Sequence, residues 1–348
     1  MESLISGLES GQDLSSTQIA TSTEFLLDDQ ADQSQKARFL KALALKGESA
    51  SEIAEFVRLF LKKATQPAFI NHRFQGPTID VCGTGGDKLN LFNVSTTSMF
   101  VVAAAGGVVI KHGNRGITSK SGGADVLEAL GIAIDLPSEK VGECLERAGV
   151  GFLFAPLYHP AFKAIVPVRQ ALAQEGQRTI FNLIGPLLNP ASPDNQLVGV
   201  FDESLCPLFA DILKRLGRKS AWVVNGKTET GDVVDELSLM GETKLSKYSS
   251  TTGFSEEQIR PQDFGLELAQ AESLQGGDAS QNASILEGVL SGEVKGPKRD
   301  MVCLNAGAAI ACAGLSKDLQ SGIELANELL TQGEALRRLR LLQEIAKS

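Results

Sequence analysis

The sequence lacks the features of secreted, membrane-spanning and nucleic-acid-binding proteins. Its longest apolar run, MFVVAAAGGVVI, is too short to cross a bilayer. The first residues, MESLISGLESGQDLSSTQ, contain neither the basic nor the apolar region of a signal peptide. The net charge of -9 and the pI of about 5.1 argue against a broad surface for nucleic acid or acidic membranes. We therefore expect a soluble, cytoplasmic protein.

Cysteine and aromatic residues are also scarce. Aromatic residues make up only 5% of the 348 residues, although hydrophobic residues reach 43%, which is enough for a substantial core. The number of cysteines is odd, and no CxxC pair occurs, which favours buried, reduced thiols over disulfides or metal ligands. The five cysteines are Cys82, Cys144, Cys206, Cys303 and Cys312.

The pattern of apolar residues changes near residue 78. Residues 1 to about 35 are polar, and we expect them to be partly mobile. QKARFLKALALKGESASEIAEFVRLFLKKA then predicts two amphipathic helices with a turn at Gly47, and either Ser49 or Ser51 caps the second helix. From PTIDVCG onward strand-like and helix-like runs alternate, and from QNASILEGVLSG onward helices dominate. This order predicts a small helical unit followed by an α/β domain with a largely parallel sheet.

A glycine-rich stretch, DVCGTGGDKLNLFNVST, separates the predicted strand TIDVC from the predicted helix STTSMFVVAAAGG. Ligands of open α/β sheets bind where strands end and helices begin, and the free N–H groups of a helix N-terminus attract anions. Ser95 and Thr96 add hydroxyl groups there. The stretch matches neither GxxxxGK[ST] nor GxGxxG. Its chemistry favours a phosphate or pyrophosphate ligand, and the alternative is a turn that only packs the helix against the sheet.

A second polar stretch, IKHGNRGITSKSGGADVLEALG, follows another short apolar strand. Lys111, Arg115 and Lys120 bring three cations into an otherwise acidic protein. The neutral donors of this stretch are Asn114, Thr118, Ser119 and Ser121. Taken alone, the stretch is typical of an exposed loop. Because two such loops each follow a strand, we expect both to converge at one edge of the sheet.

Adjacent carboxylates occur in VVDELS, at Asp235 and Glu236. Acidic pairs are common in solvated turns, and in isolation that interpretation is favoured. Beside a pyrophosphate the pair has a purpose, because magnesium is usually held by one or two carboxylates together with substrate phosphates.

Two arginines lie in VPVRQALAQEGQRTIFNLIGPLLNPA. Either Arg169 or Arg178 could bind a substrate carboxylate through two parallel hydrogen bonds, and either could be an ordinary residue on a helix surface. Composition alone does not choose between them.

The segments GTGGD, FNVST, KHGNR, SKSGGADVLEALG, RTIFNLIGPLLNPA and DELS together resemble the anthranilate phosphoribosyltransferase family, in the same order, from about residue 35 to near the C-terminus. The resemblance implies transfer of a phosphoribosyl group from phosphoribosyl pyrophosphate to anthranilate. The products are N-(5-phosphoribosyl)anthranilate and pyrophosphate, in tryptophan biosynthesis. It further implies a homodimer that uses Mg²⁺, with two ions.

The same resemblance implies a nucleoside phosphorylase/phosphoribosyltransferase-like fold in two domains. Residues 1–75 would form a small N-terminal helical domain, completed by a later segment near residues 165–190. Residues 76–348 would form the larger α/β domain, which binds phosphoribosyl pyrophosphate on a mainly parallel sheet. The active site would lie at the hinge between them.

Site residues follow from the family's motifs, position by position. Those implied to surround the pyrophosphate are Gly83, Gly86, Asp87, Asn93, Val94, Ser95 and Thr96. Those implied to hold the phosphoribosyl group are Lys111, Gly113, Arg115, Gly116, Ile117, Thr118 and Ser119, with the backbone N–H of Gly123 nearby. Those implied to face anthranilate are His112, Asn114, His159 and Arg169. The implied magnesium ligands are Ser95, Asp235 and Glu236. No catalytic nucleophile is implied, and Arg178 is left as structural.

Four features depart from the family's pattern. Leu91 stands where threonine is usual, and Gly123 stands where a small hydroxyl residue is common. LYHP replaces the paired histidines of many members, and QALAQEGQ after Arg169 is longer than usual. These departures keep two alternatives open. One is a non-catalytic or altered-acceptor paralogue of the same fold, which includes a nucleic-acid-binding protein. The other is a pyrimidine nucleoside phosphorylase, which shares the fold.

Overall fold

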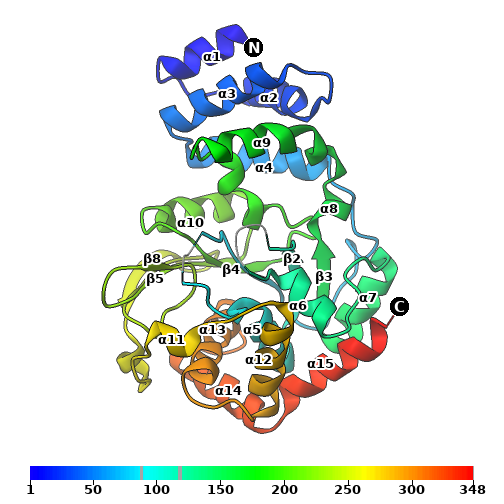
Figure 1. The fold of residues 1–348 in the computed structure, drawn as a ribbon, viewed down its shortest axis with the longest axis vertical. Coiled ribbons are helices and arrows are strands. Elements are labelled where there is room, and N and C mark those ends of the chain that lie inside the picture. Colours follow the sequence, from blue (N-terminus) through cyan, green and yellow to red (C-terminus); the bar gives the residue numbers. More distant parts are fainter. Residues whose placement is uncertain (87–88, 117–119, 348) are drawn as a thin grey trace.

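The computed structural model describes residues 1–86, 89–116 and 120–347, and shows a small helical domain stacked on a larger α/β domain (Figure 1). Four of the predicted site residues, Asp87, Ile117, Thr118 and Ser119, lie outside the described residues. The two-part α/β fold that the sequence predicts is confirmed.

The N-terminal domain begins with four helices: α1 (Glu2–Glu9), α2 (Ser16–Leu27), α3 (Gln33–Lys46) and α4 (Ala50–Lys62). The Ser49 hydroxyl accepts a hydrogen bond from the Glu52 N–H, so Ser49 rather than Ser51 caps α4. The expectation that residues 1–35 are partly mobile is wrong. Ile5 and Ile19 are almost fully buried, because the few apolar residues of α1 and α2 recur at helical spacing and face the other helices.

The chain returns to this domain after the third strand of the sheet. Helix α9 packs on α3 of the helical domain, and Val168 and Leu172 of α9 belong to the same hydrophobic core as Phe56 of α4. The elements of this returning stretch are α8 (Ala155–Tyr158), the short 3₁₀ turn η1 (Pro160–Ile165), α9 (Val166–Gln174), and two further 3₁₀ turns, η2 (Ile180–Asn182) and η3 (Gly185–Leu187). The segment that carries Arg169 therefore packs on the helical domain.

The central sheet has eight strands: β1 (Thr78–Gly83), β2 (Val108–Gly113), β3 (Val150–Phe154), β4 (Asn195–Gly199), β5 (Ser220–Lys227), β6 (Val233–Val234), β7 (Thr243–Ser249) and β8 (Gly253–Ile259). Their order is β3-β2-β1-β4-β5-β7-β8, and β6 pairs with β5. The strands from β3 to β5 are parallel, as predicted, whereas β6, β7 and β8 are antiparallel. The carboxyl ends of β1, β2 and β4 therefore share one edge.

Helices cover both faces of the sheet. Alternate strand residues point to opposite faces: Val81 packs with the C-terminal helices, and its neighbour Cys82 packs with α10 and the helical domain. The remaining helices are α5 (Val94–Ala104), α6 (Gly123–Ala129), α7 (Ser138–Ala148), α10 (Leu205–Arg215), α11 (Ala271–Leu274), α12 (Ala279–Ser291), α13 (Pro297–Cys312), α14 (Leu319–Thr331) and α15 (Glu334–Ile345), with the 3₁₀ turn η4 (Pro261–Phe264). Gly149 ends α7 in the left-handed conformation, as its sequence position predicts.

Two predictions from composition are confirmed. All five cysteines are buried and free. Within the described part of the chain, none of the helices has the length and apolar character that spanning a bilayer requires.

Candidate active site

The carboxyl ends of three neighbouring strands meet the segment that carries Asp235 and Glu236. A Cβ atom on Gly83 at the end of β1 would lie 2.3 Å from the Asp235 carboxylate, and one on Gly199 at the end of β4 would lie 1.6 Å from the Asp235 carbonyl oxygen. A Cβ atom on Gly226 of β5 would lie 2.5 Å from the Glu236 carbonyl oxygen. Only glycine leaves room for this approach, so the glycines hold the carboxylate pair over the sheet edge.

The glycine-rich loop contacts the same carboxylate directly. The Gly85 N–H donates a hydrogen bond of 2.8 Å to Asp235 Oδ2. Gly86, which follows with a φ of +101°, lies next to the Phe201 side chain, and the Phe201 N–H donates to the Thr84 hydroxyl at 3.1 Å. Gly85 therefore meets Asp235 through its backbone N–H, the kind of group with which such loops bind anions.

Lys111 joins the two predicted polar loops. Its ammonium group is almost fully buried and donates hydrogen bonds to the Val81 carbonyl oxygen and, at 3.2 Å, to the Ser95 hydroxyl at the start of α5. The Cβ position of Gly123, at the start of α6, lies 3.1 Å from Thr96 Oγ1 and 3.6 Å from Lys111 Cε. The first turns of α5 and α6 and the end of β2 thus converge, as the sequence predicts.

Asn93 precedes α5 and links three segments. Its side chain makes no capping hydrogen bond to α5, and the Val94 N–H, the first of the helix, donates to the Phe92 carbonyl oxygen at 2.7 Å. Instead Asn93 Nδ2 donates to the Ser121 carbonyl oxygen at 3.3 Å, and Asn93 Oδ1 accepts from Asn282 Nδ2 at 2.8 Å. Val94, the first residue of α5, is buried and anchors this turn in the core.

The loop after β2 is held by the first turns of α6. The Asp125 carboxylate accepts hydrogen bonds from the N–H groups of Gly116, at 2.8 Å, and Gly122, at 2.7 Å. The Arg115 guanidinium pairs with the Glu128 carboxylate at 2.7 Å. The predicted contact between Arg115 and substrate stays a prediction, since its guanidinium is engaged by Glu128 here.

Two further predicted residues of this loop have separate environments. Asn114 is exposed, and its side-chain oxygen accepts from the Arg115 N–H at 2.8 Å. Gly113 ends β2, where a Cβ atom would lie 3.0 Å from the Phe152 ring. Both therefore lie at the same strand end as His112.

A row of rings runs from the end of β2 to Arg169. The ring centroids of His112 and His159 lie 5.2 Å apart, as do those of His159 and Phe162. Phe162 is 5.8 Å from Phe181, and the Arg169 guanidinium carbon lies 5.3 Å from the Phe181 centroid. A chain of ring contacts thus links His112 and His159 to Arg169.

Both histidines of this row are neutral at pH 7. Burial, followed by the nearby His159 and Lys111, lowers the pKa of His112 to about 3. Burial also lowers the pKa of His159, and its Nε2–H donates to the Leu188 carbonyl oxygen at 2.8 Å. Burial lowers the pKa of Arg169 too, but an arginine stays charged at neutral pH. Arg169 therefore supplies a positive charge at the end of this row of rings.

The carboxylate pair has the chemistry of a partial magnesium site. Burial raises the pKa of Asp235, and the Gly85 N–H opposes that rise. Among the described residues no group of three or more histidine, cysteine, aspartate or glutamate side chains could hold a metal by itself. Two adjacent carboxylates fit magnesium when substrate oxygens supply further ligands. The residues present therefore fit magnesium bound together with a diphosphate.

Sequence reasoning missed two buried asparagines behind this site. Asn282 of α12 contacts Asn93, and Asn305 of α13 bonds to the backbone of Leu237, next to Glu236. The available signal was an amide side chain inside an otherwise apolar helical pattern, in QNASILEGVL and CLNAGAAIAC.

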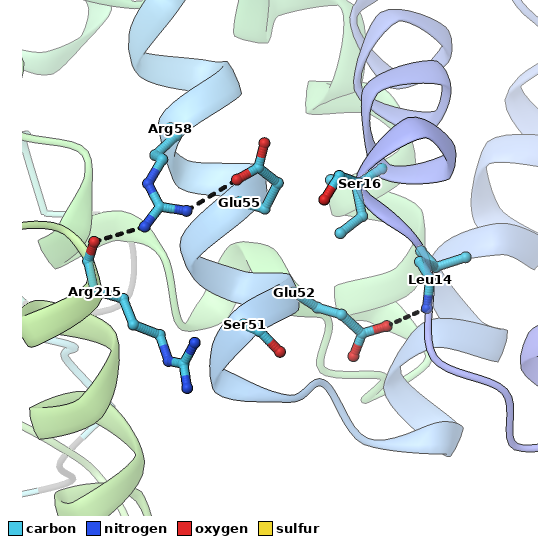
Figure 2. Close-up of a pocket in the computed structure, with 8 residues that line it drawn as sticks. Leu14, Ser16, Ser51, Glu52, Glu55, Arg58 and Arg215 are labelled. Atoms are coloured by element: carbon cyan, nitrogen blue, oxygen red, sulfur yellow. Dashed lines mark hydrogen bonds and ion pairs between the residues drawn. The ribbon is translucent and has the colours of Figure 1, made fainter.

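A separate hollow of about 180 Å³ lies between α2, α4 and α10 (Figure 2). None of the predicted site residues lines it. Arg58 pairs with Glu55 at 2.9 Å and donates to the Arg215 carbonyl oxygen at 2.6 Å, and Glu52 accepts from the Leu14 N–H at 2.9 Å. The Arg58 contact joins α4 to the end of α10, and the Glu52 contact joins α4 to Leu14 just before α2, so the polar groups of the hollow have structural partners.

Comparisons with known proteins agree with this geometry. The pattern described as glycosyl transferase family, helical bundle domain, matches residues 2–64, and that described as glycosyl transferase family, a/b domain, matches residues 75–336. The anthranilate phosphoribosyltransferase of Desulfatibacillum aliphaticivorans is 42% identical over 97% of this chain and 96% of its own. The anthranilate phosphoribosyltransferase of Symbiobacterium thermophilum is 43% identical over 99% of this chain and 97% of its own.

Solved structures give the same result. The anthranilate phosphoribosyltransferase of Thermus thermophilus has a TM-score of 0.88 and 38% identity, and the match covers 99% of both chains. The Saccharomyces cerevisiae enzyme in complex with phosphoribosyl pyrophosphate and magnesium has a TM-score of 0.83 and 27% identity, over 99% of this chain and 98% of its own. Neither of the two alternatives gains support from these comparisons. The chain therefore belongs to the anthranilate phosphoribosyltransferase family.

Proposed function

We propose that this protein transfers the phosphoribosyl group of phosphoribosyl pyrophosphate to the amine of anthranilate and releases pyrophosphate. One observation carries the proposal: Lys111 Nζ lies 3.2 Å from Ser95 Oγ where the two polar loops meet, and the ring row that begins at the adjacent His112 leads to Arg169. An anion-binding edge and an aromatic wall with one cation are thus adjacent, as a diphosphate donor and an aromatic acid acceptor require.

The proposed roles on the donor side follow from charge. Gly83, Gly86, Ser95, Thr96 and the N-terminus of α5 offer N–H and hydroxyl donors to the diphosphate. Lys111 supplies a cation there, and its bonds to Val81 and Ser95 fix its position. The role of Asp87 in the same loop is proposed from the family resemblance alone. These fixed donors stabilise the charge that develops on the departing pyrophosphate.

We propose that Asp235, Glu236 and the Ser95 hydroxyl hold magnesium, with two ions in the complete site. Bound magnesium neutralises the negative charge of the diphosphate and of the pyrophosphate that leaves. The protein's part is to keep two carboxylates at the strand ends, through the close contacts of Gly83, Gly199 and Gly226.

The proposed acceptor side is the ring row. We propose that Arg169 binds the carboxylate of anthranilate and that Asn114 contacts the opposite end of this substrate. The neutral rings of His112 and His159 would border anthranilate between these two residues. The amine of anthranilate is neutral at pH 7, so the reaction needs no strong general base. Positioning and electrostatic stabilisation are sufficient, which agrees with a pKa of about 3 for His112, since an imidazole with so low a pKa is a weak base.

We also propose a homodimer that acts in the cytoplasm. The family resemblance supports the dimer, and the five free, buried cysteines agree with a reducing compartment. For the domains, we propose residues 1–75 completed by residues near 165–190, and residues 76–348. The shared core of α4 and α9 supports the later segment.

The test is the loss of anthranilate fluorescence with purified protein. Loss that requires phosphoribosyl pyrophosphate, magnesium and protein together supports the transferase. No loss with folded protein, at substrate concentrations well above typical KM values, would contradict it. Cleavage of uridine or thymidine by phosphate, and a gel shift with DNA or RNA at low salt, would reveal the two alternatives.

A further inference from the structure

Two buried asparagines bind the backbone behind the site in the same way. Asn305 of α13 is fully buried, accepts from the Leu237 N–H and donates to the Leu237 carbonyl oxygen, each at 2.9 Å. Asn282 of α12 is 3% exposed, accepts from the Gly277 N–H at 2.8 Å and donates to the Gly277 carbonyl oxygen at 3.2 Å. Each amide therefore pairs with both polar groups of one backbone residue.

The two asparagines differ in where the second Nδ2 hydrogen points. Asn305 donates it to the Met301 carbonyl oxygen in its own helix at 2.9 Å. Asn282 donates it to Asn93 Oδ1 at 2.8 Å. Because the Gly277 N–H fixes which end of the Asn282 amide is oxygen, Asn282 in turn fixes Asn93 with its oxygen inward.

In this orientation Asn93 Nδ2 is a hydrogen-bond donor, and it gives one hydrogen to the Ser121 carbonyl oxygen at 3.3 Å. In a flipped Asn93 an oxygen, which repels phosphate, would replace this donor. The segment around Asn282 is itself pinned to the glycine-rich loop, since the Phe92 N–H donates to the Leu274 carbonyl oxygen at 3.1 Å and the Gly276 N–H to the Asn90 carbonyl oxygen at 2.9 Å.

Asn305 acts on the other half of the site. Leu237 directly follows Asp235 and Glu236, and its two backbone bonds to Asn305 fix the chain one residue beyond the carboxylate pair. On the opposite side, the close contacts with Gly199 and Gly226 limit where that backbone can move. Loss of Asn305 would leave the Leu237 N–H and carbonyl oxygen unpaired in the core, which favours displacement of this segment.

We propose that Asn282 and Asn305 are positioning residues that set the two halves of the donor site independently. Asn282 holds the Asn93 amide as a hydrogen-bond donor for the diphosphate, and Asn305 holds Asp235 and Glu236 for magnesium. This inference rests on the proposed function, because it names the diphosphate and magnesium as the groups that are positioned.

The test compares Asn282→Ala and Asn305→Ala with the wild-type full-length protein. We expect Asn282→Ala to raise the KM for phosphoribosyl pyrophosphate about tenfold, the loss of roughly one hydrogen bond, while the magnesium concentration for half-maximal rate changes less than about twofold. We expect Asn305→Ala to raise that magnesium concentration about tenfold. Neither should change the KM for anthranilate by more than about twofold. If both variants changed the KM for phosphoribosyl pyrophosphate and the magnesium requirement in the same way, the proposal would be overturned.

A double-mutant cycle separates positioning from general destabilisation. In an Asn93→Ala background, Asn282→Ala should add less than about twofold to the KM for phosphoribosyl pyrophosphate, whereas Asn305→Ala should keep its full effect on the magnesium requirement. A full additional effect of Asn282→Ala in that background would overturn its role through Asn93.

Two isosteric variants cover the case in which an alanine variant does not fold. Asn282→Asp keeps the acceptor for the Gly277 N–H but removes the donor to Asn93, so it should raise the same KM at least as much as alanine does. Asn305→Asp likewise keeps the acceptor for the Leu237 N–H but removes the donor to the Leu237 carbonyl oxygen. It should therefore raise the magnesium concentration for half-maximal rate. Unchanged constants in folded aspartate variants would overturn the proposal. An inactive wild-type protein would instead remove the proposed function, and this inference with it.

Discussion

The donor side and the acceptor side of the site are built by different means. The donor side consists of backbone groups, glycines and fixed charges at the carboxyl ends of parallel strands, where Gly85 N–H and Lys111 Nζ make direct hydrogen bonds. The acceptor side consists of rings and one guanidinium, and its segment packs on the helical domain. In the proposed function, the first binds a charged diphosphate, whereas the second binds a flat ring with a carboxylate.

This difference determines how each side should respond to substitution. Donor-side residues lie around Asp235 and the glycine-rich loop, so changes there should affect the binding of magnesium or of the diphosphate but not the binding of anthranilate. Acceptor-side residues contact one another through ring faces, and a change there should affect anthranilate alone. The predictions that follow either separate the two sides or show that they are coupled.

The largest effect should come from Asp235→Asn combined with Glu236→Gln. The two amide side chains keep the shape of the carboxylates but carry no charge to hold magnesium, so kcat should fall by about a thousandfold or more. Steady-state rates over a magnesium series measure it. Glu229→Gln, an exposed change in the same connection between β5 and β7, should leave kcat within about twofold. Wild-type kinetics in the double variant would remove the metal assignment.

Gly199→Ala should have the next largest effect. Its Cβ atom would overlap the Asp235 carbonyl oxygen at 1.6 Å, so the carboxylate segment must move, and we expect at least about a tenfold rise in the magnesium requirement together with a lower melting temperature. Gly7→Ala in α1 is the matched control, because its Cβ would meet its nearest atom at an ordinary 3.5 Å. If both variants behaved alike, the close approach of Asp235 to β4 would not matter for magnesium.

Arg169→Ala tests the acceptor side. The KM for anthranilate should rise about ten- to a hundredfold, and that for phosphoribosyl pyrophosphate less than about twofold, because the guanidinium is proposed to meet only the acceptor carboxylate. Arg178→Ala is the matched control: its guanidinium also lies over a ring, 4.1 Å from the Phe201 centroid, but beside the glycine-rich loop. Equal changes in both Michaelis constants after Arg169→Ala would contradict the division into two sides.

The smallest effect concerns pH. Because the pKa of His112 lies near 3, below the usual 6.5, the KM for anthranilate at saturating donor should show no inflection from this residue between pH 5.5 and 8. Folding stability should instead fall below pH 6.5, since only the unfolded chain binds the proton there. By pH 5 the loss is about 2 kcal/mol. Denaturant unfolding of His112→Asn beside wild type measures it, and equal pH dependence would contradict a neutral His112.

The sequence predicted the donor side better than the acceptor side. A strand followed by glycines and then a helix with Ser95 and Thr96 has a local meaning, so the loop and its convergence with Lys111 could be inferred before any contact was seen. The ring row joins residues from β2, the stretch before η1, and η2. No local sequence pattern predicts such a row of rings. The choice of Arg169 over Arg178 came from the family resemblance.

Other features could not be predicted from the sequence, for similar physical reasons. The helices α1 and α2 are held by a few apolar residues such as Ile5 and Ile19, so their polar composition hid them. The antiparallel strands β7 and β8 were not predicted, since β8 is almost entirely exposed and lacks an apolar face. Asn282 contacts Asn93, and Asn305 contacts Leu237, both far away in sequence, so only the folded chain shows these partners.

The most direct test of the central claim is to measure both products of the proposed reaction. Purified protein, phosphoribosyl pyrophosphate, anthranilate and magnesium are incubated, and N-(5-phosphoribosyl)anthranilate and pyrophosphate are quantified by mass spectrometry and an enzymatic pyrophosphate assay. We predict equal amounts of the two products, and neither of them when EDTA is added or anthranilate is omitted. Pyrophosphate formed without anthranilate consumption, or no product from folded protein, would contradict a site in which a magnesium-bound diphosphate faces an aromatic acceptor.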